Sequence, residues 1–202
     1  GITMQNHGDY NYTGSNYEQT IFLQDYEMAH PMAEQYLTLL NASDKAMEEF
    51  FAELEAYPED TIVLFFGDHF PQVEGDFFEE VHGGEFETLS QQQLQYTIPF
   101  FLWANYDIAE QEVSCTSLSY LGRYLLEKAG LELPEFYGFL ADMEQVIPSM
   151  NVDGYYSVSQ GTYLPYDEAE GEEARWLQMY AMLQYNGLFD RRDTSEHFWN
   201  VG

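Results

Sequence analysis

An uninterrupted apolar run at residues 61–66 constrains the fold more than any other feature of this sequence. The run consists mostly of β-branched and aromatic side chains, residues 58–60 form a turn before it, and Gly67 follows it. Such a run is typical of a strand that is buried on both faces of a parallel sheet. We therefore expect a central strand here, with Asp68 and His69 placed directly after its end.

Periodicity in the rest of the chain predicts helices that alternate with short strands. A second buried strand is expected at residues 96–104, and residues 2–5 are β-prone. Apolar residues recur at helical spacing over residues 32–57, where residues 41–44 predict either two helices or one bent helix. Further helices are predicted at 117–129 with Gly130 as C-terminal cap, at 133–147 and at 172–188, with a hairpin or loop at 152–168. This order predicts an α/β fold with a largely parallel sheet flanked by helices.

Composition indicates one folded unit and excludes nucleic acid as a partner. With 202 residues, of which 45% are apolar and 17% aromatic, the chain can bury a core and lacks the signature of a disordered chain. Its 36 acidic and 6 basic side chains give a formal net charge of −30, which repels phosphate backbones. We treat residues 1–150 as the main part of one domain and residues 151–202 as a C-terminal hairpin and helix that pack on it.

The sequence carries no recognisable membrane or export signal. No apolar run reaches the roughly 18 residues that a membrane span needs, and no basic segment with an apolar core resembles a signal peptide. Residues 1–4 look like the middle of a strand, so we expect the natural protein to begin upstream. Cys115 is the single cysteine, which rules out an internal disulfide.

Asp68 and His69 are the strongest candidates for a binding site. Ligands of open α/β sheets bind beyond the carboxyl ends of the strands. Neighbouring side chains of a strand point to opposite faces, so the two residues can contact one ion only if the chain turns at Gly67. A carboxylate oxygen with an imidazole nitrogen suits zinc or manganese better than calcium. The alternative is a polar strand end in which Asp68 caps a loop.

The other titratable residues give weaker signals. His7 follows the β-prone residues 2–5 and is placed to face the same rim of the sheet, where it would bind an anionic group of a substrate. The alternative for His7 is a surface turn. His30 and His82 are expected to be solvated loop residues. The acidic segment 79–87 lacks the Asp-x-Asp-x-Asp-Gly order of a calcium loop and is expected to be a solvated loop.

Six segments carry a combined pattern. They are Thr3-Met4-Gln5-Asn6-His7-Gly8, Asp44-Lys45-Ala46 with Phe50, TIVLFFGDH at 61–69, TIPFFLWANYDI at 97–108, LGRYLLEKAG at 121–130, and Gln184-Tyr185-Asn186 with Leu188-Phe189. In this order they resemble the extracellular catalytic domain of the lipoteichoic acid synthase family, whose C-terminal signature is QYD-x-L-F-G. The similarity covers nearly the whole chain.

The resemblance implies an alkaline phosphatase or sulfatase-like fold, of which this chain would be a partial domain. It also implies a divalent metal, with manganese first and zinc, magnesium or calcium as alternatives. The implied reaction is transfer of glycerol phosphate from a lipid donor through a covalent threonine intermediate, by an enzyme that acts on glycerol-phosphate groups of a membrane lipid or a cell-wall polymer. By the resemblance, Asp68 and His69 are metal ligands and His7 contacts the substrate phosphate.

The resemblance also implies that the chain is incomplete as an enzyme. The nucleophile and the remaining metal ligands belong to the N-terminal half of such proteins, which act on the extracellular face of a bacterial membrane. We therefore expect the 202-residue chain alone to be inactive and to bind metal weakly. Asp9 stands where relatives usually have proline and Asn186 where the signature has aspartate. The charge of Asp9 near a site for an anionic substrate indicates a donor other than the usual lipid.

Two alternative functions stay open. A sulfatase would use the same sheet and metal pair, but it needs a Cys or Ser within C/S-x-P-x-R, and Cys115 is not in that setting. The second alternative, from another class, is a non-catalytic acidic surface domain that binds calcium or a partner protein. The intact Asp68 and His69 favour metal chemistry over that alternative.

Overall fold

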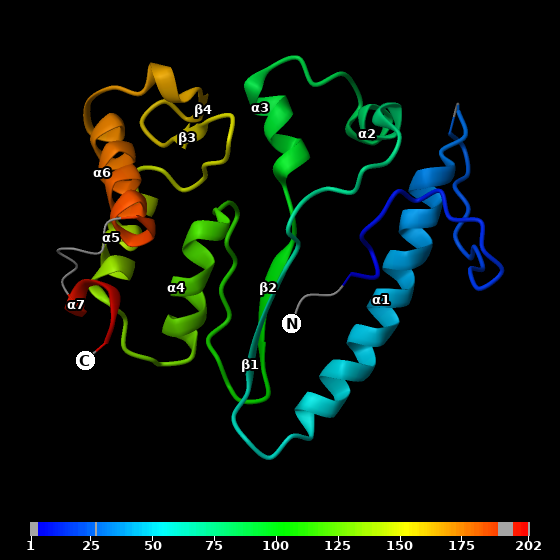
Figure 1. Cartoon of the computed structure of the whole chain (residues 1–202), viewed down its shortest axis with the longest axis horizontal. Helices are drawn as coiled ribbons and strands as arrows, with labels where there is room; N and C mark the ends of the chain where they lie inside the picture. Colours follow the sequence, from blue (N-terminus) through cyan, green and yellow to red (C-terminus); the bar gives the residue numbers. More distant parts are fainter. Residues whose placement is uncertain (1–3, 27, 190–195, 202) are drawn as a thin grey trace.

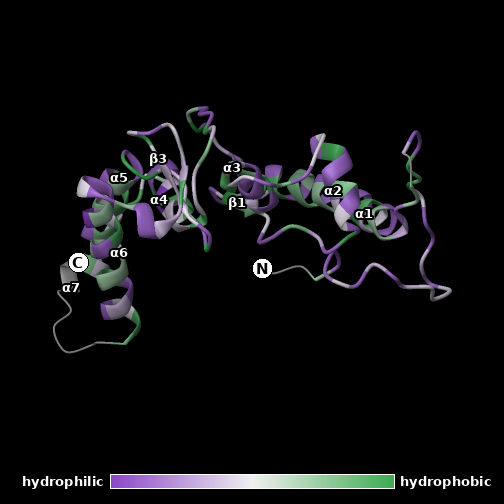
Figure 2. Cartoon of the chain, turned by 90° about the horizontal axis from the view of Figure 1, so that it is seen from above, coloured by the Kyte–Doolittle hydropathy of each residue, from purple (hydrophilic) through white to green (hydrophobic). Residues whose placement is uncertain are grey.

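The computed structural model describes residues 4–26, 28–189 and 196–201, which form helices packed around a narrow sheet (Figure 1). In chain order the elements are α1 (Pro31–Glu55), β1 (Ile62–Phe66), α2 (Gly75–His82), α3 (Leu89–Gln92), the 3-10 helix η1 (Gln93–Tyr96), β2 (Phe100–Ala104), α4 (Leu118–Lys128), α5 (Glu135–Glu144), β3 (Tyr155–Ser157), β4 (Thr162–Leu164), the 3-10 helix η2 (Tyr166–Glu168), α6 (Gly171–Leu188) and α7 (Glu196–Trp199). Seen from above, α5 and α6 lie at one end of the molecule and α1 and α2 at the other, with β1 between them (Figure 2).

Strands β1 and β2 form an antiparallel pair, so the expectation of parallel pairing is wrong although the α/β class is confirmed. The register pairs Ile62 with Ala104 and Phe66 with Phe100. The connection over residues 67–99 returns the chain to the C-terminal end of β1. Strand β2 starts there and therefore runs in the opposite direction. Within the described ranges neither strand has another partner.

Helices lie on both faces of the pair, but β1 is only partly buried and Phe65 and Phe66 stay exposed, so the expectation of a central strand buried on both faces is wrong. On one face, Leu64 and Leu102 pack against a buried cluster formed by Tyr120, Leu121 and Tyr124 of α4 with Leu140 of α5. On the other face, the ring of Phe51 in α1 lies 5.0 Å from Trp103 of β2, between ring centroids. Helices on both faces favour apolar residues at successive positions, whatever the direction of the neighbouring strand.

Helix α1 is continuous over 25 residues, so the interruption predicted at residues 41–44 does not form. Ser43, which lies inside this helix, donates its hydroxyl to Oδ1 of Asn6 at 3.0 Å. A serine is tolerated inside a helix when its side chain bonds away from the helix backbone.

The C-terminal elements follow the sequence closely. The helices predicted at 117–129, 133–147 and 172–188 are confirmed as α4, α5 and α6, and strands β3 and β4 form a hairpin within 152–168. Gly130 has a φ of 68° and the N–H of Leu131 donates to the carbonyl of Leu126 at 3.0 Å, which confirms the glycine cap after α4. A second buried cluster, of Met143, Ile147 and Tyr155, joins α5 to this hairpin.

Two further expectations concern the N-terminus and the membrane. The strand expected at residues 2–5 is not formed at Met4 and Gln5, where the N–H of His7 donates to the carbonyl of Met4 at 3.2 Å and closes a turn. Residues 2–3 lie outside the described residues. No helix in the described part of the chain is long and apolar enough to cross a membrane.

Candidate functional site

Strand β1 ends at Phe66, and Gly67 lets the chain leave the strand there. The N–H of Gly67 donates to the carbonyl of Pro99 at 3.2 Å, which ties the exit of β1 to the start of β2. A Cβ at position 67 would lie 3.3 Å from Cβ of Ile98, so a larger residue would push the two segments apart. Asp68 and His69 therefore follow the strand directly, outside its hydrogen-bonded ladder.

Asp68 and His69 are adjacent and both reach solvent. Their side chains are 81% and 59% exposed. The backbone N–H of His69 donates to Oδ1 of Asp68 at 2.9 Å, and Oδ2 of Asp68 lies 3.7 Å from Nε2 of His69. One carboxylate oxygen is thus held by the local backbone, while the other faces the imidazole.

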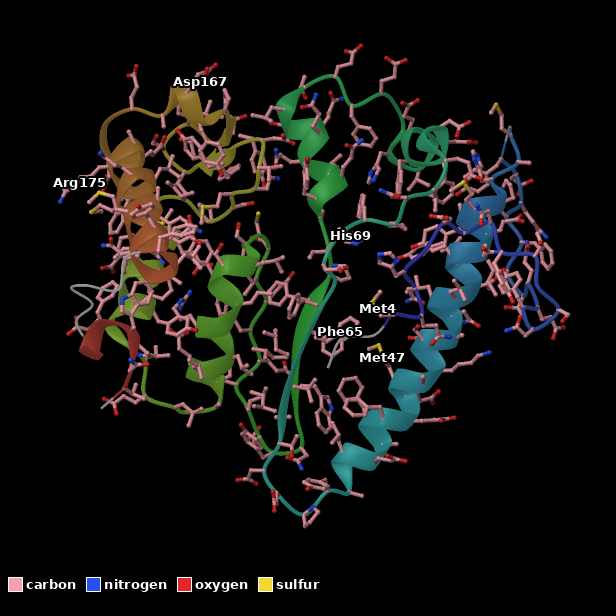
Figure 3. All side chains as sticks on the ribbon, in the orientation of Figure 1. Met4, Met47, Phe65, His69, Asp167 and Arg175 are labelled. Carbon is pink, nitrogen blue, oxygen red and sulfur yellow. The ribbon has the colours of Figure 1, made fainter. Side chains whose placement is uncertain are left out.

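The imidazole of His69 is oriented by the next residue. Its Nδ1 lies 2.7 Å from the carbonyl oxygen of Phe70, and since a carbonyl can only accept, Nδ1 carries the hydrogen. In the neutral ring, Nε2 then has a free lone pair that faces Asp68. A hydrogen bond from the second ring nitrogen to a backbone carbonyl is typical of histidines that bind metals. Figure 3 shows His69 just beyond the end of β1.

His7 comes to the same place from the N-terminal loop. Its ring lies edge-on to the ring of His69, with 6.4 Å between the centroids. His7 is exposed, so its ring can reach a ligand in solvent. The structure therefore brings together the three residues that the sequence analysis singled out, two from the exit of β1 and one from the loop before α1.

Tyr10 holds this loop and was not found from the sequence. It is 6% exposed, its hydroxyl donates to the carbonyl of Asn6 at 2.5 Å, and its ring packs edge-on against Tyr36 of α1 at 5.4 Å. Burial raises the pKa of the Tyr10 hydroxyl, and the charges of Tyr36 and Asp68 raise it further. An isolated tyrosine in a loop has no periodicity that would reveal such a role, and its nearness to His7 in sequence was the available signal.

The donor atoms fit a transition metal in type but not in number. An imidazole nitrogen beside a carboxylate oxygen suits manganese or zinc. In the part of the chain that the structure describes, no three His, Cys, Asp or Glu side chains are grouped so that they could hold an ion. An ion at Asp68 and His69 would therefore need further ligands, since about four or more are usual.

His30 is buried, so the expectation that it is solvated is wrong. It is 2% exposed, with Nε2 3.2 Å from Glu80 and Nδ1 3.7 Å from Asp76 of α2. His30 directly precedes Pro31, the first residue of α1, and packs against α2. Because the sequence indicated a loop at this position, this contact was not predicted. His82 is exposed, as predicted, but it is the last residue of helix α2 rather than part of a loop.

The fold and these residues define a mixed α/β domain that carries a carboxylate–imidazole pair beyond a strand end. The family model Sulfatase matches residues 2–131, which is more than half of the chain, so the protein belongs to the sulfatase family. The resemblance to sulfatase-like members of the alkaline phosphatase superfamily, which the sequence motifs indicated, is thereby confirmed. Members of this superfamily generally use divalent metals.

Two similar proteins extend this result. The chain is 21% identical, over an alignment of 217 residues, to a putative cyclic β-1,2-glucan modification protein of Rhizobium meliloti (strain 1021). This alignment covers 98% of the present chain and 32% of the Rhizobium protein. The fold matches Streptococcus pyogenes phosphoglycerol transferase GacH, solved in complex with sn-glycerol-1-phosphate, with a TM-score of 0.67 and 19% identity. That match covers 100% of this chain and 47% of GacH. The chain therefore spans a third to a half of the proteins that it matches.

Proposed function

We propose that this chain is the metal-binding and phosphate-binding part of an extracellular phosphoglycerol transferase. Asp68 and His69 hold a divalent ion, manganese in the first instance, and His7 contacts the phosphate of a glycerol-phosphate donor. The observation that carries the proposal is the convergence of the three side chains at the end of β1. The complex of GacH with sn-glycerol-1-phosphate supports this class of substrate.

Each of the three residues has a task that its surroundings permit. Nε2 of His69 offers a lone pair because Nδ1–H is bound to the Phe70 carbonyl, and Asp68 adds negative charge beside it. When bound, a divalent ion neutralises charge on a phosphoryl group and lowers the pKa of a nucleophile. The exposed ring of His7 donates an N–H to a non-bridging phosphate oxygen. On a chain with a net charge of −30, a bound divalent ion and the N–H of His7 would offset the repulsion of an anionic substrate.

The nucleophile and the remaining metal ligands lie, in this proposal, in a part of the protein outside this chain. The partial coverage of both relatives supports this division. We expect the purified chain with Mn²⁺ to leave a chromogenic phosphodiester, bis-p-nitrophenyl phosphate, intact. Hydrolysis that disappears in Asp68→Ala would overturn this part of the proposal.

A sulfatase is the second candidate, because the matching family model carries that description. The two reactions differ in the nucleophile. Sequencing the coding region upstream of Gly1 separates them, since a threonine at the nucleophile position supports the transferase and a Cys or Ser in C/S-x-P-x-R establishes a sulfatase. The relative named for cyclic β-1,2-glucan modification supports a carbohydrate acceptor in the transferase case.

The metal site is tested by titrating Mn²⁺ into the chain with isotope-labelled histidine and following the ring signals by NMR. Bound Mn²⁺ broadens nearby signals, so those of His69 and His7 are expected to broaden together. Asp68→Ala should raise the Mn²⁺ concentration required by about tenfold or more. The matched control is Asp60→Ala, an exposed aspartate at the opposite end of β1, which should leave the titration unchanged. Equal titrations for both variants would remove Asp68 from the site.

A further inference from the structure

We propose that Glu74 is a positioning residue that holds His69 and His7 at a fixed distance from each other. It does so by attaching the His69 loop, residues 67–74, to α1, the helix that also contacts the loop of His7. The link to catalysis rests on the proposed function. The geometric claim concerns this chain alone.

The first step is a helix cap that comes from a distant part of the chain. Helix α1 begins after His30, whose side chain makes no capping hydrogen bond. The free N–H groups of the first turn need acceptors. Glu74 supplies both of its carboxylate oxygens, to the N–H of Met32 at 2.8 Å and to the N–H of Ala33 at 3.0 Å. The negative charge also interacts favourably with the helix N-terminus.

The second step connects Glu74 to His69. Glu74 is the N-cap residue of α2 and ends the segment that begins at Gly67. Within this segment, the Phe70 carbonyl accepts from the His69 ring, and the Phe70 ring stacks on Phe78 of α2 with 5.2 Å between centroids and 4° between planes. The His69 loop is therefore fixed at one end to β2 through Gly67 and at the other end to α1 through Glu74.

The third step connects the same helix to His7. Tyr36 of α1 packs against Tyr10, and Ser43 of α1 donates to Asn6, the residue before His7. In Figure 1 the N-terminal segment runs alongside α1. Both loops of the candidate site are thus attached to one helix. For the His69 loop, Glu74 makes the attachment at the loop's end, and His30 adds contacts to Asp76 and Glu80 of α2.

The competing explanation is that Glu74 only stabilises α1, as any helix cap does. A cap of that kind would change the stability of the chain without changing the distance between His7 and His69. The edge-on arrangement at 6.4 Å brings ring hydrogens close enough for a nuclear Overhauser contact, which can be measured without metal. This contact therefore separates positioning from stabilisation.

The experiment records the His7–His69 contact by NMR in the metal-free chain and in variants. We expect Glu74→Ala to lose the contact, and Glu74→Asp to lose it as well because the shorter side chain cannot reach both N–H groups. Glu74→Gln should weaken the contact to an intermediate extent, since its amide oxygen can accept from only one of the two N–H groups and its NH₂ group cannot accept from the other. The control is Thr88→Ala, which removes the capping box of α3, where Thr88 accepts from the N–H of Gln91 at 3.3 Å. Both Glu74→Ala and Thr88→Ala remove a helix cap, but Thr88→Ala should keep the contact.

Three outcomes would overturn the proposal: an intact contact in the folded Glu74→Ala and Glu74→Asp variants, its loss in Thr88→Ala, or its absence from the unaltered chain. The Mn²⁺ titration is a separate arm. If the contact responds to Glu74 as expected but Mn²⁺ broadens neither histidine, the metal function fails while the positioning role stands. If both arms succeed, Glu74→Ala should separate the two titrations, with His7 requiring about tenfold more Mn²⁺ than His69.

Discussion

The two regions of this chain use their apolar residues differently. In the C-terminal region, residues 113–188, the side chains of Tyr120, Leu140, Met143, Ile147 and Tyr155 are at most 1% exposed. In the N-terminal region, residues 4–104, the strand aromatics stay 36% exposed at Phe65, 46% at Phe66 and 37% at Phe101. Most of the packed core thus lies in one region, and the candidate site lies in the other, at the end of a strand pair that is covered incompletely.

The carboxylates of the two regions also differ in how far they are exposed to solvent. In the C-terminal region, Glu144 and Glu173 are 7% and 6% exposed, and each accepts several hydrogen bonds from neighbouring side chains. In the N-terminal region, Asp68 is open to solvent and keeps one oxygen facing His69. Satisfied buried carboxylates stabilise the fold, whereas an open one is available to a ligand.

The largest effect is expected for Glu144→Ala. Glu144 pairs with Arg123 and accepts from the hydroxyls of Tyr124 at 2.8 Å and Thr116 at 2.7 Å. Its removal leaves a buried guanidinium without this partner, which costs about 3–5 kcal/mol in the free energy of unfolding. Urea denaturation measures the loss. Glu127→Ala is the control, because Glu127 pairs with the same arginine but is 39% exposed, and its loss should cost about 1 kcal/mol or less. Equal costs would mean that the Glu144 network is not a core element.

A core truncation comes next. Met143 is 0% exposed in the cluster with Ile147 and Tyr155, so Met143→Ala should cost about 2–4 kcal/mol through the cavity it leaves. Met182 of α6 is 59% exposed, and Met182→Ala should change stability by about 0.5 kcal/mol at most. Thermal unfolding of the two variants gives the comparison. A small loss for Met143→Ala would show that this cluster is not tightly packed.

Glu173→Gln should have a smaller effect that depends on pH. Burial alone would raise the pKa of the Glu173 carboxyl, but hydrogen bonds from the hydroxyls of Ser157, Ser159 and Tyr155 outweigh it and hold the pKa below its ordinary value. A lowered pKa in the folded state adds stability above the unfolded pKa of about 4.3, and this stability is lost as the pH falls through the folded value.

At pH 7 the substitution should therefore cost about 1–3 kcal/mol, the range for hydrogen bonds to a charged group. The difference between Glu173→Gln and the unaltered chain should shrink below about pH 4. Urea unfolding at several pH values tests this, and the difference removes the contribution of the other carboxylates. A cost that stays constant down to pH 3 would contradict the lowered pKa.

Local periodicity predicted the helices of the C-terminal region, because α4, α5 and α6 each have apolar residues at helical spacing that form one packed face. It did not give the direction of β2, since an apolar run such as residues 61–66 carries no information about the direction of the neighbouring strand. The helix break predicted at residues 41–44 was wrong because the local sequence does not reveal the contacts that this segment makes. Ser43 has a partner, Asn6, that is remote in sequence.

The residues of the candidate site show the same distinction between local sequence signals and contacts that are remote in sequence. Asp68 and His69 could be selected from the sequence because a glycine follows a strongly apolar strand, and His7 because it follows a short β-prone segment. Tyr10 and Glu74 could not, since their contacts join loops to α1 across long stretches of chain. His30 was misjudged because its burial depends on α2, which lies far along the sequence.

The smallest effect is expected on the exposed face of the strand pair in the N-terminal region. Phe65 stacks on Phe101 with 5.1 Å between ring centroids and faces α1 in Figure 3. Because Phe65 stays 36% exposed, Phe65→Ala should cost about 1 kcal/mol, the size of one aromatic pair. In a longer protein whose additional residues cover this face, the same substitution should cost about 3–5 kcal/mol, as in a closed core. Urea unfolding of both lengths tests this, and a large cost already in the 202-residue chain would mean that the N-terminal region is packed as tightly as the C-terminal one.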